Sequence, residues 1–179
     1  MALKSTIYKI NLSVSDMDRY YFNDFNLTVA RHPSETEGRM MIRILAFALH
    51  AQEKLCFTRG LFAEEEPEVW VKNYSGDIEL WVELGLPDEK RIKKACVQSE
   101  EVVLYAYGDR TLNLWWEKNK HYCQRFDHLK VLALSDDMTS QLVTMAQKNM
   151  DVQCHIEDHQ VWFSDGENRF LVEIEYLKR

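Results

Sequence analysis

The stretch GDIELWVELGLPDEKRIKKA, residues Gly76–Ala95, carries the strongest structural signal in the chain. An apolar run that alternates with acids predicts a half-buried strand, and the following Leu-Pro-Asp opens a helix rich in Lys and Arg. Because side chains alternate between the two faces of a strand, Glu79 and Glu83 share one face, with Asp77 at its edge. These carboxylates therefore fit either a metal site or the solvated face of a strand.

The flanking segments predict an α/β protein. The expected elements around this stretch are strands at 68–73 and 77–86, a helix at 87–99, a strand at 101–108, a helix at 110–124, a strand at 128–135 and a helix at 136–149. The first two strands should pair as a hairpin. The later strand, helix, strand order implies parallel pairing, because a parallel neighbour needs a crossover connection.

The two ends of the chain add strands and one deeply placed helix. Ser34 and Glu37 fit a capping box that begins an apolar helix, whose first turn includes Glu35. This helix is apolar around most of its circumference, so we expect it inside the fold. The remaining segments are an N-terminal hairpin at 3–14 and 20–31, an irregular loop at 57–68 and three short strands within 151–179.

Composition predicts one soluble domain of ordinary size. The chain has 179 residues, of which 46% are hydrophobic, and a formal net charge of -7. That charge argues against a strong non-specific nucleic-acid binder, because such proteins carry a surplus of Lys and Arg. The four scattered cysteines form no C-x-x-C pair and should be free thiols. With neither an apolar leader nor a membrane-length apolar run, the protein is expected to be cytoplasmic and not bound to a membrane.

The acids of the central stretch need a partner to hold an ion. Glu79 and Glu83 are four residues apart on a strand, which separates them by roughly 13 Å. One ion cannot bind both directly, so Glu35 or Asp77 would have to assist. Oxygen ligands of this kind suit Mg²⁺, which polarises a phosphate and lowers the pKa of an attacking water.

The helix that follows the strand supplies basic and amide groups. Arg91, Lys94 and Gln98 lie on one side of it, where Lys94 is suited to stabilise charge on a phosphate and Gln98 and Arg91 to position a substrate. Metal-assisted phosphodiester cleavage uses such a combination of acids and an amine. The same pattern is also typical of a solvated strand face followed by a solvated helix.

Three other groups of residues could have a function. Cys154, His155, Glu157 and His159 could form a metal cluster in a turn, Trp115 and Trp116 could stack on bases, and Arg59 with Gly60 could form a phosphate-binding loop. Each group is also typical of ordinary turns or of a packed core. No GxSxG, Walker or GxGxxG pattern occurs, so serine nucleophiles and nucleotide-dependent phosphoryl transfer have no support.

Four segments resemble the YaeQ family of bacterial proteins. They are MALKSTIYK, ARHPSETEGRMM, FTRGL and WVELGLPDEKRIKKAC, and the resemblance extends over residues 1–179 as a single domain. It implies a restriction-endonuclease-like fold, a variant of the PD-(D/E)XK arrangement. This would be a mixed sheet flanked by helices, with additional N- and C-terminal β-hairpin strands.

The resemblance also assigns roles. Glu83 matches the acid of the (D/E)-x-K element, Gly85 stands where its lysine belongs, and Lys94 would supply the amine from the next helix. The other acids would be Glu79 or Asp77 for the first carboxylate of the motif and Glu35 for the helix acid that some nucleases use.

Two functions are open at this point. One is a Mg²⁺-dependent nuclease with Glu79, Glu83, Lys94 and Gln98 as catalytic residues. The other is a non-enzymatic binding or regulatory protein that retains the nuclease-like fold.

Overall fold

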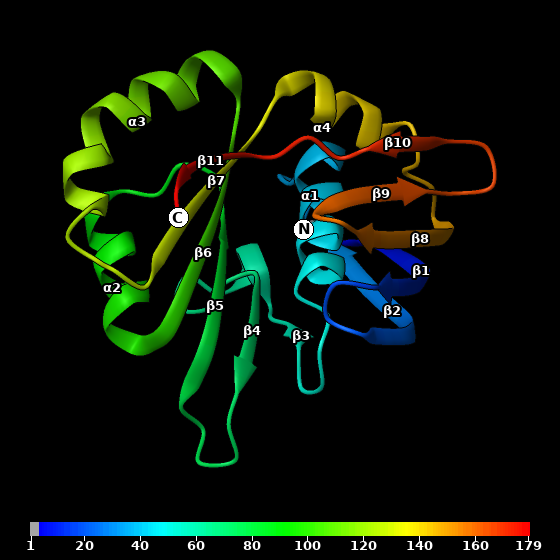
Figure 1. Cartoon of the computed structure of the whole chain (residues 1–179), viewed down its shortest axis with the longest axis horizontal. Coiled ribbons are helices and arrows are strands. Elements are labelled where there is room, and N and C mark those ends of the chain that lie inside the picture. Colours follow the sequence, from blue (N-terminus) through cyan, green and yellow to red (C-terminus); the bar gives the residue numbers. More distant parts are fainter. Residues whose placement is uncertain (1–3) are drawn as a thin grey trace. The chain divides into compact units, whose positions relative to one another are not determined.

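The computed structural model describes residues 4–179 as a mixed α/β protein (Figure 1). The chain divides into two compact units. The first contains the described residues up to Gln52 together with Asp137–Glu173, and the second contains Glu53–Asp136 with Ile174–Arg179. The predicted α/β class is confirmed, and a single domain over residues 1–179 stays a prediction. No helix within residues 4–179 is both long and apolar enough to cross a membrane.

The first unit contains a five-stranded sheet in the order β10-β9-β8-β1-β2. Strands β1 and β2 form the predicted antiparallel hairpin, and β8 lies parallel to β1. Alternation along β1 buries Ile10, Leu12 and Val14 and leaves Ser13 on the opposite face. The strand bounds are Thr6–Asp16 for β1, Tyr21–Arg31 for β2, Asn149–Glu157 for β8, Gln160–Ser164 for β9 and Arg169–Leu171 for β10.

Helix α1 (Glu37–Leu49) lies in the interior of the first unit, as its apolar composition predicts. The ring of Phe47 packs edge-on against Phe25 of β2, with 5.3 Å between the ring centroids. Near its start, a Cβ on Gly38 would lie 2.7 Å from the side chain of Thr139 in helix α4 (Asp136–Val143). Glycine at this position therefore allows α1 and α4 to approach each other closely.

The start of α1 differs from the predicted capping box. Thr36 is the N-cap, and its hydroxyl accepts a hydrogen bond of 3.1 Å from the backbone N–H of Arg39. Ser34 lies two residues earlier, with its hydroxyl 2.6 Å from His32 Nδ1. The Ser34 cap was wrong because the sequence offers two hydroxyl residues before the helix, and either one suits an N-cap. Glu35 consequently precedes the helix instead of lying in its first turn.

The second unit contains a six-stranded sheet in the order β11-β7-β6-β5-β4-β3. Strands β4 and β5 form the predicted hairpin, and β5, β6 and β7 run parallel as the crossover order predicts. The bounds are Cys56–Phe57 for β3, Val69–Lys72 for β4, Ile78–Leu84 for β5, Ser99–Tyr107 for β6, Leu129–Leu134 for β7 and Glu175–Lys178 for β11. The crossover helices are α2 (Glu89–Gln98) and α3 (Asp109–Cys123).

Both faces of β5 are buried over its second half. Trp81 has 0% relative exposure and packs in a core cluster to which α2 and α3 also contribute, while Leu80, Val82 and Leu84 are buried on the other face. Glu83 is 8% exposed, whereas Glu79 is exposed. The carboxylates of the central stretch thus occupy two different environments, although their spacing on the strand is regular.

Three segments differ from their predicted form. The loop at 57–68 contains the end of β3 and a short 3₁₀ turn at Gly60–Phe62. Helix α4 ends at Val143 because backbone bonds of the 3₁₀ type tighten the chain from Thr144 to Ala146. The tail contains a fourth strand, β11, which pairs with β7 and has no turn signal before it in the sequence.

Replacing Thr36 with Ala should lower the free energy of unfolding by about 1 kcal/mol, because the N–H of Arg39 loses its partner. Ser34→Ala is the matched control and should change stability by less than about 0.5 kcal/mol. Urea denaturation followed by circular dichroism measures both. A larger loss in Ser34→Ala than in Thr36→Ala would show that Ser34 is the functional cap.

Candidate functional site

Glu83 is a buried carboxylate near the C-terminal end of β5. Its Oε2 accepts hydrogen bonds from the indole N–H of Trp81 at 2.8 Å and from Nε of Arg91 at 3.0 Å. Trp81 lies two residues earlier on the same face of the strand, and Arg91 comes from α2. A buried carboxylate is costly unless it is paired and hydrogen-bonded, and these two donors meet that requirement.

Arg91 joins three parts of the second unit. Its backbone N–H bonds to the side chain of Asp88, the N-cap of α2, at 2.8 Å. Its guanidinium lies 5.1 Å from the ring centroid of Trp81 and also donates to the carbonyls of Glu64 and Glu66. The guanidinium therefore fixes the loop at 64–66 beside the end of β5, in addition to neutralising Glu83.

Burial raises the pKa of Glu83, and the negative charge of Glu68 adds to this effect. The Arg91 guanidinium and the Trp81 N–H act in the opposite direction without cancelling the shift. Glu68 is itself 3% exposed, and its backbone N–H donates to the carbonyl of Val82, one residue before Glu83. Two acids thus lie near each other in a buried part of the second unit.

Glu68 did not emerge from the sequence as a candidate. It lies just before β4, in a run of acids that predicts only a solvated loop. The signal that could have identified it is its position directly before β4, the strand that pairs with β5. Pairing across strands, and not spacing along one strand, brings it near Glu83.

Gly85 directly follows β5 and has a φ of +99°, and its N–H bonds to the carbonyl of Tyr105 at 2.9 Å. A lysine rarely adopts this left-handed backbone conformation, even though no neighbouring atom lies within 4 Å of a Cβ built there. Backbone geometry therefore explains why glycine follows β5 at this position.

Lys94 and Gln98 follow Arg91 along α2. The Lys94 ammonium pairs with the carboxylate of Glu65 in the loop at 64–66, and this contact lowers the pKa of Glu65. Gln98 is the last residue of the helix and is exposed. Lys94 thus contacts the same loop that Arg91 fixes.

Asp77 and Glu79 lie at the opposite end of β5 from Gly85. Asp77 is exposed and accepts a hydrogen bond of 3.1 Å from the side-chain amide of Asn73 in the hairpin turn. Glu79 is exposed and is roughly 13 Å from Glu83 along the strand. A role for either residue beside Glu83 stays a prediction.

Glu35 belongs to the first unit and is buried there. Its two carboxyl oxygens accept hydrogen bonds from Arg39 at 2.9 Å and Arg43 at 2.8 Å, and its backbone carbonyl accepts one from Arg31. The carboxylate is thus engaged by two guanidinium groups of the same unit.

The other candidates have ordinary structural contacts. Trp115 and Trp116 pack against the core of the second unit, and the Trp115 indole donates to the carbonyl of Pro87 at 2.7 Å. Arg59 pairs with Glu66 at 2.8 Å. The cysteines are free thiols, as predicted. Within residues 4–179, no group of three or more His, Cys, Asp or Glu side chains is arranged to hold a metal ion.

Glu68 and Glu83 match Mg²⁺ by ligand type, because this ion prefers carboxylate oxygens and retains several water ligands. Burial and, to a smaller extent, the negative charge of Glu68 raise the pKa of Glu83, and a cation nearby would oppose both effects. Arg91 provides one such charge, so an ion bound to the same carboxylate competes with its guanidinium.

Replacing Glu83 with Gln should alter the pH dependence of stability. The pKa of Glu83 in the folded state is raised above the ordinary value of 4.5. The stability that the protonated Glu83 contributes is therefore fully present below about pH 4.5 and is lost as the pH rises through the folded-state pKa. The difference in free energy of unfolding should therefore shift in favour of Glu83→Gln between about pH 4 and about pH 8. Urea denaturation at several pH values measures this difference.

Glu79→Gln, on the same strand, measures the effect of replacing an exposed acid. If the difference between Glu83→Gln and the wild type were independent of pH, the assignment of Glu83 as a carboxylate with a raised pKa would be contradicted.

Comparison with known proteins places the chain in a family. The family model described as YaeQ protein matches residues 1–174. The YaeQ proteins of Escherichia coli K12 and Salmonella typhi are 48% and 49% identical to it over 174 residues, which cover 97% of this chain and 96% of each relative. The crystal structure of the Xanthomonas axonopodis pv. citri YaeQ protein matches with a TM-score of 0.93 and 38% identity, covering 98% of this chain and 99% of that one. The Pseudomonas syringae YaeQ structure also gives 0.93, with 31% identity and coverage of 98% and 97%. The chain belongs to the YaeQ family.

Proposed function

We propose that this protein is a divalent-metal-dependent phosphodiesterase that acts on nucleic acid. The observation that carries the proposal is the buried Glu83 carboxylate, with a raised pKa, beside Glu68 and the basic helix α2. Perturbed carboxylates that lie at the end of a central strand are typical of functional sites.

The order of elements supports a restriction-endonuclease-like core. The β4–β5 hairpin is followed by α2 and by the parallel strand β6, and the acid of the proposed (D/E)-x-K element lies near the end of β5. Pro67-Glu68 directly precedes β4 and resembles the Pro-acid half of the PD-(D/E)XK motif. We therefore prefer Glu68 over Asp77 or Glu79 as the second acid, because it lies beside the buried end of β5.

Glu68 and Glu83 would hold Mg²⁺ through their carboxylate oxygens, and the bound ion would supply a Lewis acid for the phosphate and an activated water. Arg91 positions Glu83 through the bond between its Nε and Oε2. Lys94 supplies a positive charge near the same loop, where it would stabilise negative charge on the phosphate. Because the positive φ of Gly85 disfavours a lysine there, the amine of the motif would come from Lys94 of α2.

One observation favours the second candidate, a binding or regulatory protein. The Arg91–Glu83 ion pair already neutralises the acid without an ion, which suits a fold that has kept its architecture and lost its chemistry. Under this alternative, the protein would bind its partner and leave phosphodiester bonds intact.

Incubating single- and double-stranded DNA and RNA with Mg²⁺ or Mn²⁺ tests both candidates. We expect cleavage by the wild type that falls at least about 100-fold in Glu83→Gln, because loss of a metal ligand removes several kcal/mol of transition-state stabilisation. Lys94→Ala should lose about tenfold or more.

Lys93→Ala and Glu100→Ala are matched controls, since both residues are exposed and neither contacts the proposed site. Circular dichroism establishes that each variant is folded. Cleavage that survives in both Glu83→Gln and Lys94→Ala would exclude this site, and binding without cleavage of any substrate would support the alternative function.

A further inference from the structure

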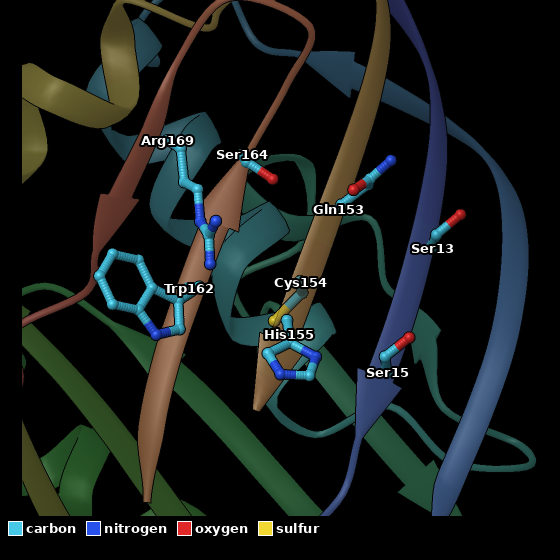
Figure 2. A pocket seen from close by; sticks show the side chains of 8 residues that line it. All are labelled: Ser13, Ser15, Gln153, Cys154, His155, Trp162, Ser164 and Arg169. Carbon is cyan, nitrogen blue, oxygen red and sulfur yellow. The ribbon is translucent and has the colours of Figure 1, made fainter. Parts of the chain in front are cut away.

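A polar groove crosses the exposed face of the sheet in the first unit (Figure 2). Its volume is about 580 Å³, within the range of small-molecule sites. We call it the sheet groove, and the residues that matter here are Ser15, Gln153, His155, Trp162, Ser164 and Arg169.

Strand register explains the shape of the groove. Ser15 of β1 lies beside His155 of β8, which lies opposite Trp162 of β9. Ser164 of β9 lies opposite Arg169 of β10. Small serine side chains therefore alternate with larger side chains across neighbouring strands on one face. The serines leave a hollow, which His155, Trp162 and Arg169 border.

Arg169 has hydrogen-bonding capacity to spare. Its guanidinium lies 4.8 Å from the ring centroid of Trp162, and the two side chains lie together at the β9–β10 side of the groove (Figure 2). In the part of the chain that the structure describes, this guanidinium has no ion pair or hydrogen bond, whereas Arg19, Arg59 and Arg91 each pair with a carboxylate. Its five donors are directed to solvent or to a ligand.

The neighbouring polar groups are available as well. Across residues 4–179, the side chains of Ser15, Gln153 and Ser164 and the indole N–H of Trp162 make no hydrogen bond to another protein group. Hydroxyl and amide groups of this kind fix the orientation of a bound small molecule. The sheet groove thus combines a Trp–Arg stack, a guanidinium that no carboxylate of residues 4–179 pairs with, and several neutral donors and acceptors.

We propose that the sheet groove binds a nucleoside monophosphate. The planar base stacks on the Trp162–Arg169 pair, because bases stack both on aromatic rings and on guanidinium planes. The phosphate accepts charge-assisted hydrogen bonds from Arg169. The ribose hydroxyls bond to the serine and Gln153 side chains, which border the same hollow.

Apart from Lys9 of β1, the charges along the rest of this sheet face are acidic, which favours a monomer over a polymer. Asp24 accepts a hydrogen bond of 2.6 Å from Ser13, Asp151 accepts one of 2.7 Å from Asn11, and Glu157 lies 3.3 Å from His155. These carboxylates would repel a phosphodiester backbone that continued across the sheet. A single phosphate beside Arg169 avoids them. This site lies in the first unit and does not depend on the proposed phosphodiesterase activity.

Isothermal titration calorimetry with adenosine 5′-monophosphate tests the proposal. Ribose 5-phosphate, inorganic phosphate and a single-stranded RNA hexamer serve as competing probes. We expect one molecule of adenosine 5′-monophosphate per chain, with tighter binding than ribose 5-phosphate or phosphate. The hexamer should bind no more tightly than the monophosphate.

Arg169→Gln should weaken binding at least about tenfold, because it removes the charged hydrogen bonds to the phosphate. Trp162→Ser should also weaken it at least about tenfold, because it removes the stacking surface. Trp162→Phe keeps a ring and should retain most of the affinity. Arg125→Gln is the matched control, since Arg125 is exposed and stacks on Tyr122 at 5.3 Å in the second unit.

Equal binding of adenosine 5′-monophosphate and inorganic phosphate would overturn the stacking role. Binding that is unchanged in Arg169→Gln would overturn the site. Tighter binding of the hexamer would overturn the preference for a monomer.

Discussion

The ion pair between Glu83 and Arg91 is the interaction on which the second unit depends. A carboxylate removed from water loses far more solvation than one neutral hydrogen bond returns, so it needs a cation and further donors. Arg91 and Trp81 supply them at 3.0 Å and 2.8 Å. The same guanidinium also binds the carbonyls of Glu64 and Glu66. The need of Glu83 for a cation therefore holds β5, α2 and the loop at 64–66 together.

This requirement places a buried acid with a raised pKa near the end of β5. The parallel order of β5, β6 and β7 covers Trp81 with α2 and α3, and the burial that results raises the pKa of Glu83. The pairing of β4 with β5 brings Glu68 near Glu83. Lys94 lies one turn after Arg91 on α2 and contacts Glu65 in the loop at 64–66. The groove in the first unit arises differently, because small side chains on neighbouring strands leave space on an exposed face.

Sequence periodicity predicted most of the elements and the parallel order, because these follow from local patterns in GDIELWVELGLPDEKRIKKA and its flanks. It could not separate Glu79 from Glu83, which have the same place in the alternation and differ only in what covers them. It also missed Glu68, whose proximity to Glu83 comes from strand pairing, and it chose Ser34 over Thr36 where two hydroxyls compete. Tertiary contacts decide each of these cases, and no single segment encodes them.

The role of Glu83 is tested most directly by titrating its side-chain carboxyl by carbon-13 NMR, with and without Mg²⁺, using Glu83→Gln to assign the signal. We predict a midpoint above that of an ordinary glutamate in the absence of the ion. Mg²⁺ should lower this midpoint, because a bound cation favours the ionised carboxylate. A midpoint that Mg²⁺ leaves unchanged would contradict a metal-binding role for Glu83, and an ordinary midpoint would contradict its raised pKa.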